Sequence, residues 1–254
     1  MLLPVKIVSK ACINTQRYFT ACWLILGVLL SHTVVAAPVM TLPLCFHIVD
    51  GLPMQKKGVE MVSWVSPENI TQTLLPEANR IWLPAGIQFQ ISCINKINVV
   101  DHPRKLELLQ QVEQASRDED GKSDKQRIHA LDALIDKKSH NPSAINIYLV
   151  PYLGEASQGN TSRKQRRIYL GQWTDKASKA SMPPLKFSLI EVGEYRQGSL
   201  GRTLAHEIGH VLGLQHPDKT SQVEFDLLMG GRKEGYTLTT QEIQTARQFA
   251  SSFH

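Results

Sequence analysis

Hydrophobic and polar positions follow two different rhythms along this chain, and each rhythm predicts one type of element. Residues 87–93 alternate apolar and polar side chains with period two, which is typical of a half-buried strand. Residues 66–82 instead place apolar side chains every three or four positions, after Ser66 as N-cap and Pro67 at the first helical position, and this predicts an amphipathic helix. Further strands are expected at 42–51, 145–150, 166–173 and 185–192, and a closing helix is expected to begin at 239.

Residues 101–140 interrupt the strands with charged sequence of helical period. One helix is predicted within 103–117, and the capping box at 123–126 predicts the start of a second helix. The acidic run at 118–120 joins the two. We interpret the segment as a helical hairpin inserted between strands, and its charge favours a solvent-exposed elaboration over a lid that gates a substrate.

The first 37 residues differ in composition from the rest of the chain. Basic residues precede an apolar run at 22–30 and a small-residue ending at 34–37, which is the pattern of a secretory signal peptide. Residues 18–37 are also long enough for an uncleaved membrane anchor, but the small-residue ending favours cleavage. We therefore predict a signal peptide at 1–37 and a secreted or periplasmic domain at 38–254, with a membrane-anchored, exported domain as the alternative.

Most of the net charge of +5 belongs to the predicted signal peptide. Without its three basic residues, the chain has 25 basic and 23 acidic residues, so its composition gives no case for binding nucleic acid. Cys12 and Cys22 leave with the signal peptide, whereas Cys45 and Cys93 remain as an even pair in an oxidising compartment. These two cysteines are predicted to form a disulfide.

The stretch that carries the candidate chemistry reads H-E-x-x-H-x-x-G-x-x-H. On a helix, His206 and His210 project from one face, so both imidazoles can bind one Zn²⁺. Glu207 can hydrogen-bond a water and act as general base. Gly213 can end the helix, and the turn it allows would bring His216 to the same metal. Three histidines leave a fourth position open for water, which indicates a catalytic rather than a structural zinc site.

A methionine in a glycine-closed turn, Met229, follows the third histidine. The long histidine motif and this turn together resemble the metzincin clan of zinc metallopeptidases. The resemblance implies an α+β, metzincin-like zincin fold with a twisted mixed β-sheet, an active-site helix and a short C-terminal subdomain. It implies an upper subdomain at 38–216, carrying the 101–140 insertion, and a lower subdomain at 217–254. Gly231 occupies the position where some members of the clan carry a tyrosine, and no family within the clan is assigned.

By the same resemblance, the three histidines bind one catalytic Zn²⁺, Glu207 is the general base, and Met229 forms a hydrophobic floor below the metal. The strand, helix and strand at the start of the domain are similar to the opening of the metzincin fold. This similarity would place Cys45 and Cys93 on neighbouring strands.

In the metzincin clan, which this sequence resembles, an edge strand above the active-site helix pairs with the main chain of an extended substrate. Residues 168–173 are the candidate for this strand, with Tyr169, Leu170 and Gly171 as substrate-binding residues.

We therefore expect an exported, monomeric, zinc-dependent endopeptidase that acts on a protein or peptide substrate. A nucleic-acid partner is not expected, nor a stable membrane partner once the signal is cleaved. One alternative is a proteolytically inactive zinc protein that binds a partner through its cleft, although the presence of Glu207 counts against it. Another is a protease of narrow specificity, which the motif cannot distinguish from a general degrader because specificity depends on the shape of the cleft.

Overall fold

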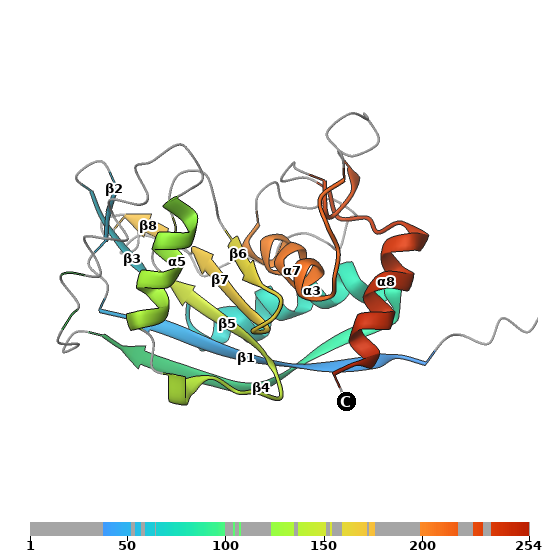
Figure 1. Ribbon diagram of the computed structural model, residues 1–254, viewed down its shortest axis with the longest axis horizontal. Coiled ribbons are helices and arrows are strands. Elements are labelled where there is room, and N and C mark those ends of the chain that lie inside the picture. The colour runs from blue at the N-terminus through green and yellow to red at the C-terminus, as the bar shows by residue number, and fades with distance from the viewer. Residues whose placement is uncertain are drawn as a thin grey trace, which may run out of the picture. The chain divides into compact units, whose positions relative to one another are not determined.

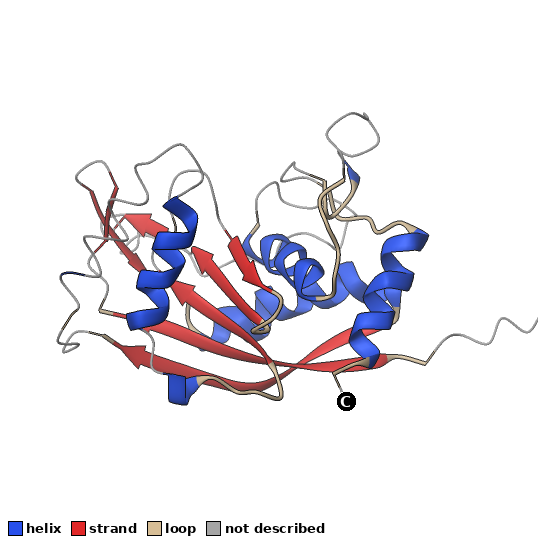
Figure 2. Ribbon diagram, viewed as in Figure 1, coloured by secondary structure: helices blue, strands red, loops and turns tan. Residues whose placement is uncertain are grey.

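The computed structural model describes residues 38–51, 54–56, 59–63, 65–99, 104, 107, 123–134, 137–150, 153, 159–171, 173–175, 199–217, 226–230 and 235–253 (Figures 1 and 2). The chain divides into two compact units, Met1–Pro38 and Val39–His254. The predicted signal peptide lies outside the described residues. Among the described helices, none combines the length and the apolar character that crossing a bilayer requires.

The second unit has an α+β structure built on a five-stranded mixed sheet. In spatial order its strands are β4 (Ile87–Asn98), β1 (Met40–Asp50), β5 (Ile145–Val150), β7 (Arg167–Gly171) and β6 (Gly159–Ser162). Four of them run parallel, and β6 pairs antiparallel with β7. A separate three-stranded antiparallel sheet contains β2 (Met54–Lys56), β3 (Val59–Ser63) and β8 (Trp173–Asp175).

The described helical segments come from five regions of the sequence. They are α2 (Pro67–Asn69), η1 (Ile70–Leu74), α3 (Leu75–Trp82) and η2 (Leu83–Ala85), then α5 (Ser123–Leu134), η3 (Lys137–Ser139), α7 (Leu200–Val211) and α8 (Thr240–Ser251). The predicted helix at 66–82 is confirmed as the run from α2 to α3. Ser66 and Asn69 cap each other reciprocally, because each side chain accepts the backbone N–H of the other.

The inner strands of the sheet, β1, β5 and β7, are buried on both faces, and their alternate residues belong to two hydrophobic clusters. Even-numbered side chains of β1, such as Phe46, join a large cluster with α3, α7 and α8. On the other face, Tyr148 and Tyr169 join a smaller cluster with Ala130 and Leu131 of α5. Helices α3, α7 and α8 therefore pack on one face of the sheet and α5 packs on the other (Figure 1).

The interpretation of the 101–140 insertion as a solvent-exposed elaboration is wrong for its second helix. Ala130 and Leu131 are buried against the sheet, where they belong to the same hydrophobic cluster as Tyr148 and Tyr169. Packing of the helix on this face removes the apolar surface of these side chains from water. Of the first predicted helix, only Arg104 and Glu107 are described, and they form an exposed ion pair. The predicted strand at 185–192 lies outside the described residues.

The predicted disulfide between Cys45 and Cys93 is confirmed. The two cysteines stand opposite each other on the neighbouring parallel strands β1 and β4, with their Cα atoms 4.6 Å apart. The bond therefore joins β1, the first strand in the sequence, to β4 at one edge of the sheet.

Candidate metal site

Helix α7 is the element that positions the candidate ligands. Its N-cap is Ser199, whose hydroxyl oxygen accepts the Arg202 N–H at 3.1 Å. Leu204 and Ile208 are fully buried in the large cluster. The indole N–H of Trp82 donates to the Ala205 carbonyl at 3.1 Å. These contacts fix the helix within the core of the protein. They also fix the backbone positions from which its histidine side chains extend toward the site.

The end of α7 returns the chain toward the site through a Schellman turn. Leu214 N–H donates to the Gly209 carbonyl at 2.9 Å, and Gly213 N–H donates to the His210 carbonyl at 3.1 Å. Gly213 has a φ of 87°, and a Cβ there would lie 2.9 Å from Cζ of Phe249 on α8. Glycine is required on both counts, and the turn it forms carries the chain to His216.

His206, His210 and His216 converge as predicted, with their candidate ligand atoms within 4.8 Å of one another. Nε2 of His210 lies 3.0 Å from Nε2 of His216. Two nitrogens bound to one tetrahedral Zn²⁺ at about 2.0–2.1 Å would lie about 3.3 Å apart. The three histidines could therefore hold a single metal ion.

The hydrogen bonds of two of the rings, those of His206 and His210, leave their Nε2 atoms without a proton. Nδ1 of His206 lies 2.7 Å from the Leu228 carbonyl, and Nδ1 of His210 lies 3.1 Å from the Leu214 carbonyl. A carbonyl only accepts, so each Nδ1 carries the proton and each Nε2 keeps its lone pair. Loss of solvation lowers the pKa of all three histidines, that of His206 to about 3. All three rings are consequently neutral near pH 7, as metal ligands must be.

Glu207 lies against the edge strand β6. The Thr161 hydroxyl donates to Oε2 of Glu207, and a Cβ at position 159 would lie 2.6 Å from its Cδ. Both strand residues face α7, because they stand opposite Leu170 and Ile168 of the large cluster. Burial raises the pKa of Glu207 to about 7, although the Thr161 hydroxyl and the Arg202 guanidinium lower it. The carboxyl group can therefore exchange a proton near neutral pH.

Met229 lies against Gly209 of α7, the residue before His210. Its side chain is fully buried, and a Cβ at Gly209 would lie 2.6 Å from its sulfur. The carbonyl of Leu228, one residue earlier, accepts from both His206 and Arg202. The methionine turn is thus held directly against α7.

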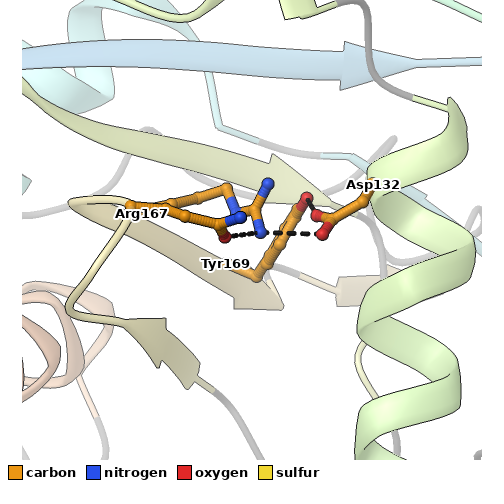
Figure 3. Close-up of polar contacts among 4 residues, drawn as sticks. Asp132, Arg167 and Tyr169 are labelled. Atoms are coloured by element: carbon orange, nitrogen blue, oxygen red, sulfur yellow. Dashed lines mark hydrogen bonds and ion pairs between the residues drawn. The ribbon is translucent and has the colours of Figure 1, made fainter. Parts of the chain in front are cut away.

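The prediction that residues 168–173 form the edge strand is wrong. β7 lies between β5 and β6, so Tyr169 and Leu170 are buried, and among the strands that the structure describes the edge beside the site is β6. Tyr169 points away from the histidines toward α5, where its hydroxyl donates to Asp132 (Figure 3). Nη2 of Arg167 donates to the same carboxylate at 2.7 Å. Gly171 ends this inner strand on the same face.

Two residues that contact the site were missed from the sequence. Thr161 lies in the polar sequence at 159–162, where no hydrophobic pattern signals a strand. Arg202 precedes His206 by four residues, so a charged side chain on the same helix face as the histidines was the signal that could have identified it.

The fold and the site define an α+β protein with three histidines that could hold a metal ion. No protein-family model and no curated protein matches the chain. One similar solved structure is described as "Structure of a chaperone-substrate complex", with 12% sequence identity and a TM-score of 0.43. The match covers 86% of this chain and 35% of that one, so this chain spans about a third of the length of its neighbour.

Proposed function

We propose that this protein is an exported zinc-dependent endopeptidase of the metzincin type. The observation that carries the proposal is the convergence of three neutral histidines beside the buried carboxyl group of Glu207. A protein that only stores or binds a metal has no need of a buried group that exchanges protons at this place. Such a group is what peptide hydrolysis requires of a general base.

Zinc is the metal proposed for the three histidines. Neutral imidazole nitrogens suit this borderline ion, and three protein ligands leave a position for water. When bound, Zn²⁺ supplies a Lewis acid that polarises the scissile carbonyl and makes water more acidic.

In the proposed reaction, Glu207 accepts the proton of the water that attacks the scissile carbonyl. The same carboxyl group then donates this proton to the nitrogen of the leaving amine. A pKa of about 7 suits both steps, because the group can take up and release the proton near neutral pH. Thr161 keeps the carboxylate beside β6 through its hydroxyl hydrogen bond.

Two features support a metzincin-like fold. The mixed sheet ends in an antiparallel edge strand, β6, that contacts the helix bearing the histidines. The buried Met229 lies against the same helix. We propose that an extended peptide substrate pairs with the main chain of β6, in place of the strand first predicted.

The test compares the purified protein with a Glu207→Gln variant. Zinc content is measured for both, and both are incubated with an unfolded protein substrate. The proposal expects cleavage by the parent, loss of cleavage with a chelator, recovery with zinc, and a variant that binds zinc but does not cleave. Cleavage by the variant at the parental rate would refute the role of Glu207. If both bind one zinc ion and neither cleaves, an inactive partner-binding protein becomes the better description.

A further inference from the structure

Arg202 is a buried charged residue one helical turn before His206. Only 6% of it is exposed, although it carries a guanidinium group. Its Nε donates to the Gly235 carbonyl at 2.8 Å, and its Nη2 donates to the Leu228 carbonyl at 2.8 Å. One side chain of α7 thus holds two points of the chain that follow the histidine motif.

The Leu228 carbonyl connects Arg202 to a metal ligand. The same oxygen that accepts from Arg202 accepts from Nδ1 of His206 at 2.7 Å. A carbonyl oxygen has two lone pairs and can accept both bonds. The direction of the Nδ1–H bond sets the plane of the imidazole, and the plane sets where Nε2 points. The position of the Leu228 carbonyl oxygen therefore determines the direction in which Nε2 of His206 points.

We propose that Arg202 is a positioning residue for the metal site. It holds the Leu228 carbonyl where that carbonyl orients His206, and in this way it strengthens metal binding. The inference rests on the proposed binding of zinc. The planar fork of arginine can reach two carbonyls at once, whereas the ammonium of lysine is a single point charge.

Simple electrostatics predicts the opposite sign. The positive charge of Arg202 acts on His206 and His216, so it also repels a cation bound between them. Removal of the charge alone should tighten metal binding. Loss of positioning should weaken it. The direction of the change therefore separates the two effects.

The experiment measures the affinity of the full chain for Zn²⁺ by competition with a chromophoric chelator. The variants are Arg202→Met and Arg202→Lys, and thermal unfolding of each metal-free protein is recorded beside them. The control is Arg247→Met, because Arg247 of α8 also donates to two backbone carbonyls, those of Ala85 and Gly86, at 2.8 and 3.4 Å. Arg202→Met is expected to lower the affinity by about 10–100-fold, as outer-shell changes do, and the control to leave it unchanged.

Arg202→Lys keeps the charge and loses the fork, so its affinity is also expected to fall. If Arg202→Met does not fold, the Zn²⁺ affinity of Arg202→Lys tests the positioning role in its place. Wild-type or tighter affinity in the folded Arg202 variants would overturn the positioning role, and so would an equal loss in Arg247→Met. If the unmodified protein binds no zinc, the proposed function fails as well. The two failures are therefore distinguishable.

Discussion

Histidine side chains are buried on both faces of the sheet, but their ring nitrogens have different partners on each face. On the α5 face, Nε2 of His47 lies 3.0 Å from the Asn146 amide oxygen, and its Nδ1 lies 3.3 Å from the Asn95 amide nitrogen. Its ring also stacks on Tyr148, with the centroids 4.4 Å apart. Both nitrogens of His47 thus have side-chain partners. His47 is therefore a packed histidine.

On the α7 face, His206 and His210 each use Nδ1 to bond a carbonyl, and together with His216 they bring one candidate ligand atom each within 4.8 Å of the others. Burial lowers the pKa of His47 as it lowers that of His206. A shifted pKa therefore does not distinguish a ligand from a packed histidine. The difference lies in the partners of the nitrogens, because both nitrogens of His47 contact side-chain amides, whereas Nε2 of His210 faces Nε2 of another histidine, His216.

The largest expected effect is a loss of zinc affinity that occurs when a histidine of the α7 face is replaced and not when His47 of the α5 face is replaced. His206→Ala removes a ligand and should lower zinc affinity by more than about 100-fold, beyond the range of outer-shell changes. His47→Ala leaves a cavity and removes one hydrogen-bond partner from each of two amides, and should destabilise the fold by about 2–4 kcal/mol without weakening zinc binding. Chelator competition and urea unfolding measure the two quantities. A comparable loss of affinity in His47→Ala would contradict the division between the faces.

A matched pair of glycines tests the contact between β6 and Glu207. In Gly159→Ala, the new Cβ meets the Glu207 side chain, so hydrolysis should slow by about 10–100-fold as the base is displaced. In Gly171→Ala, the Cβ lies 3.2 Å from Leu153 N on the other face, and activity should be retained. The measurement is kcat/KM on one peptide substrate. A fully active Gly159→Ala variant would show that the strand does not hold the carboxylate.

The polar contacts on the α5 face should matter for stability alone. Asp132→Asn removes the charge that pairs with Arg167, whose side chain is 15% exposed, and should destabilise the fold by about 1–3 kcal/mol. Zinc affinity should not change. Glu107→Gln, which breaks the exposed ion pair with Arg104, serves as the control and should have no measurable effect on unfolding. A change in zinc affinity in Asp132→Asn would argue that the two faces are coupled.

Acid should destabilise the metal-free protein through its buried histidines. The pKa of His206 is about 3 in the folded state against an ordinary 6.5, so the unfolded chain binds more protons between these values. The free energy of unfolding therefore falls as the pH drops below 6.5, by about 1 kcal/mol from His206 between pH 6.5 and 5.5. Urea unfolding at both values measures the change. His206→Gln should reduce this pH dependence, and an undiminished one would contradict the assignment.

Local pattern was sufficient for much of the fold and of the site. Spacing within one helix and one turn determined that His206, His210 and His216 could meet, because these relations span only eleven residues of sequence. Period and capping residues predicted the helix at 66–82 and most of the strands of the main sheet. The even pair of cysteines, in a chain that the sequence predicted to be exported, predicted the disulfide.

Only the tertiary structure decided which strand is the edge and which residues support the site. The strand β6 is short and polar, so nothing in its own sequence marks it, and its place depends on pairing with β7. Thr161 reaches Glu207 across 46 residues of sequence. Arg202 and His206 meet at a carbonyl that follows them by more than twenty residues. Such contacts depend on how distant segments pack, whereas the histidine motif depends on the geometry of a single helix and its turn.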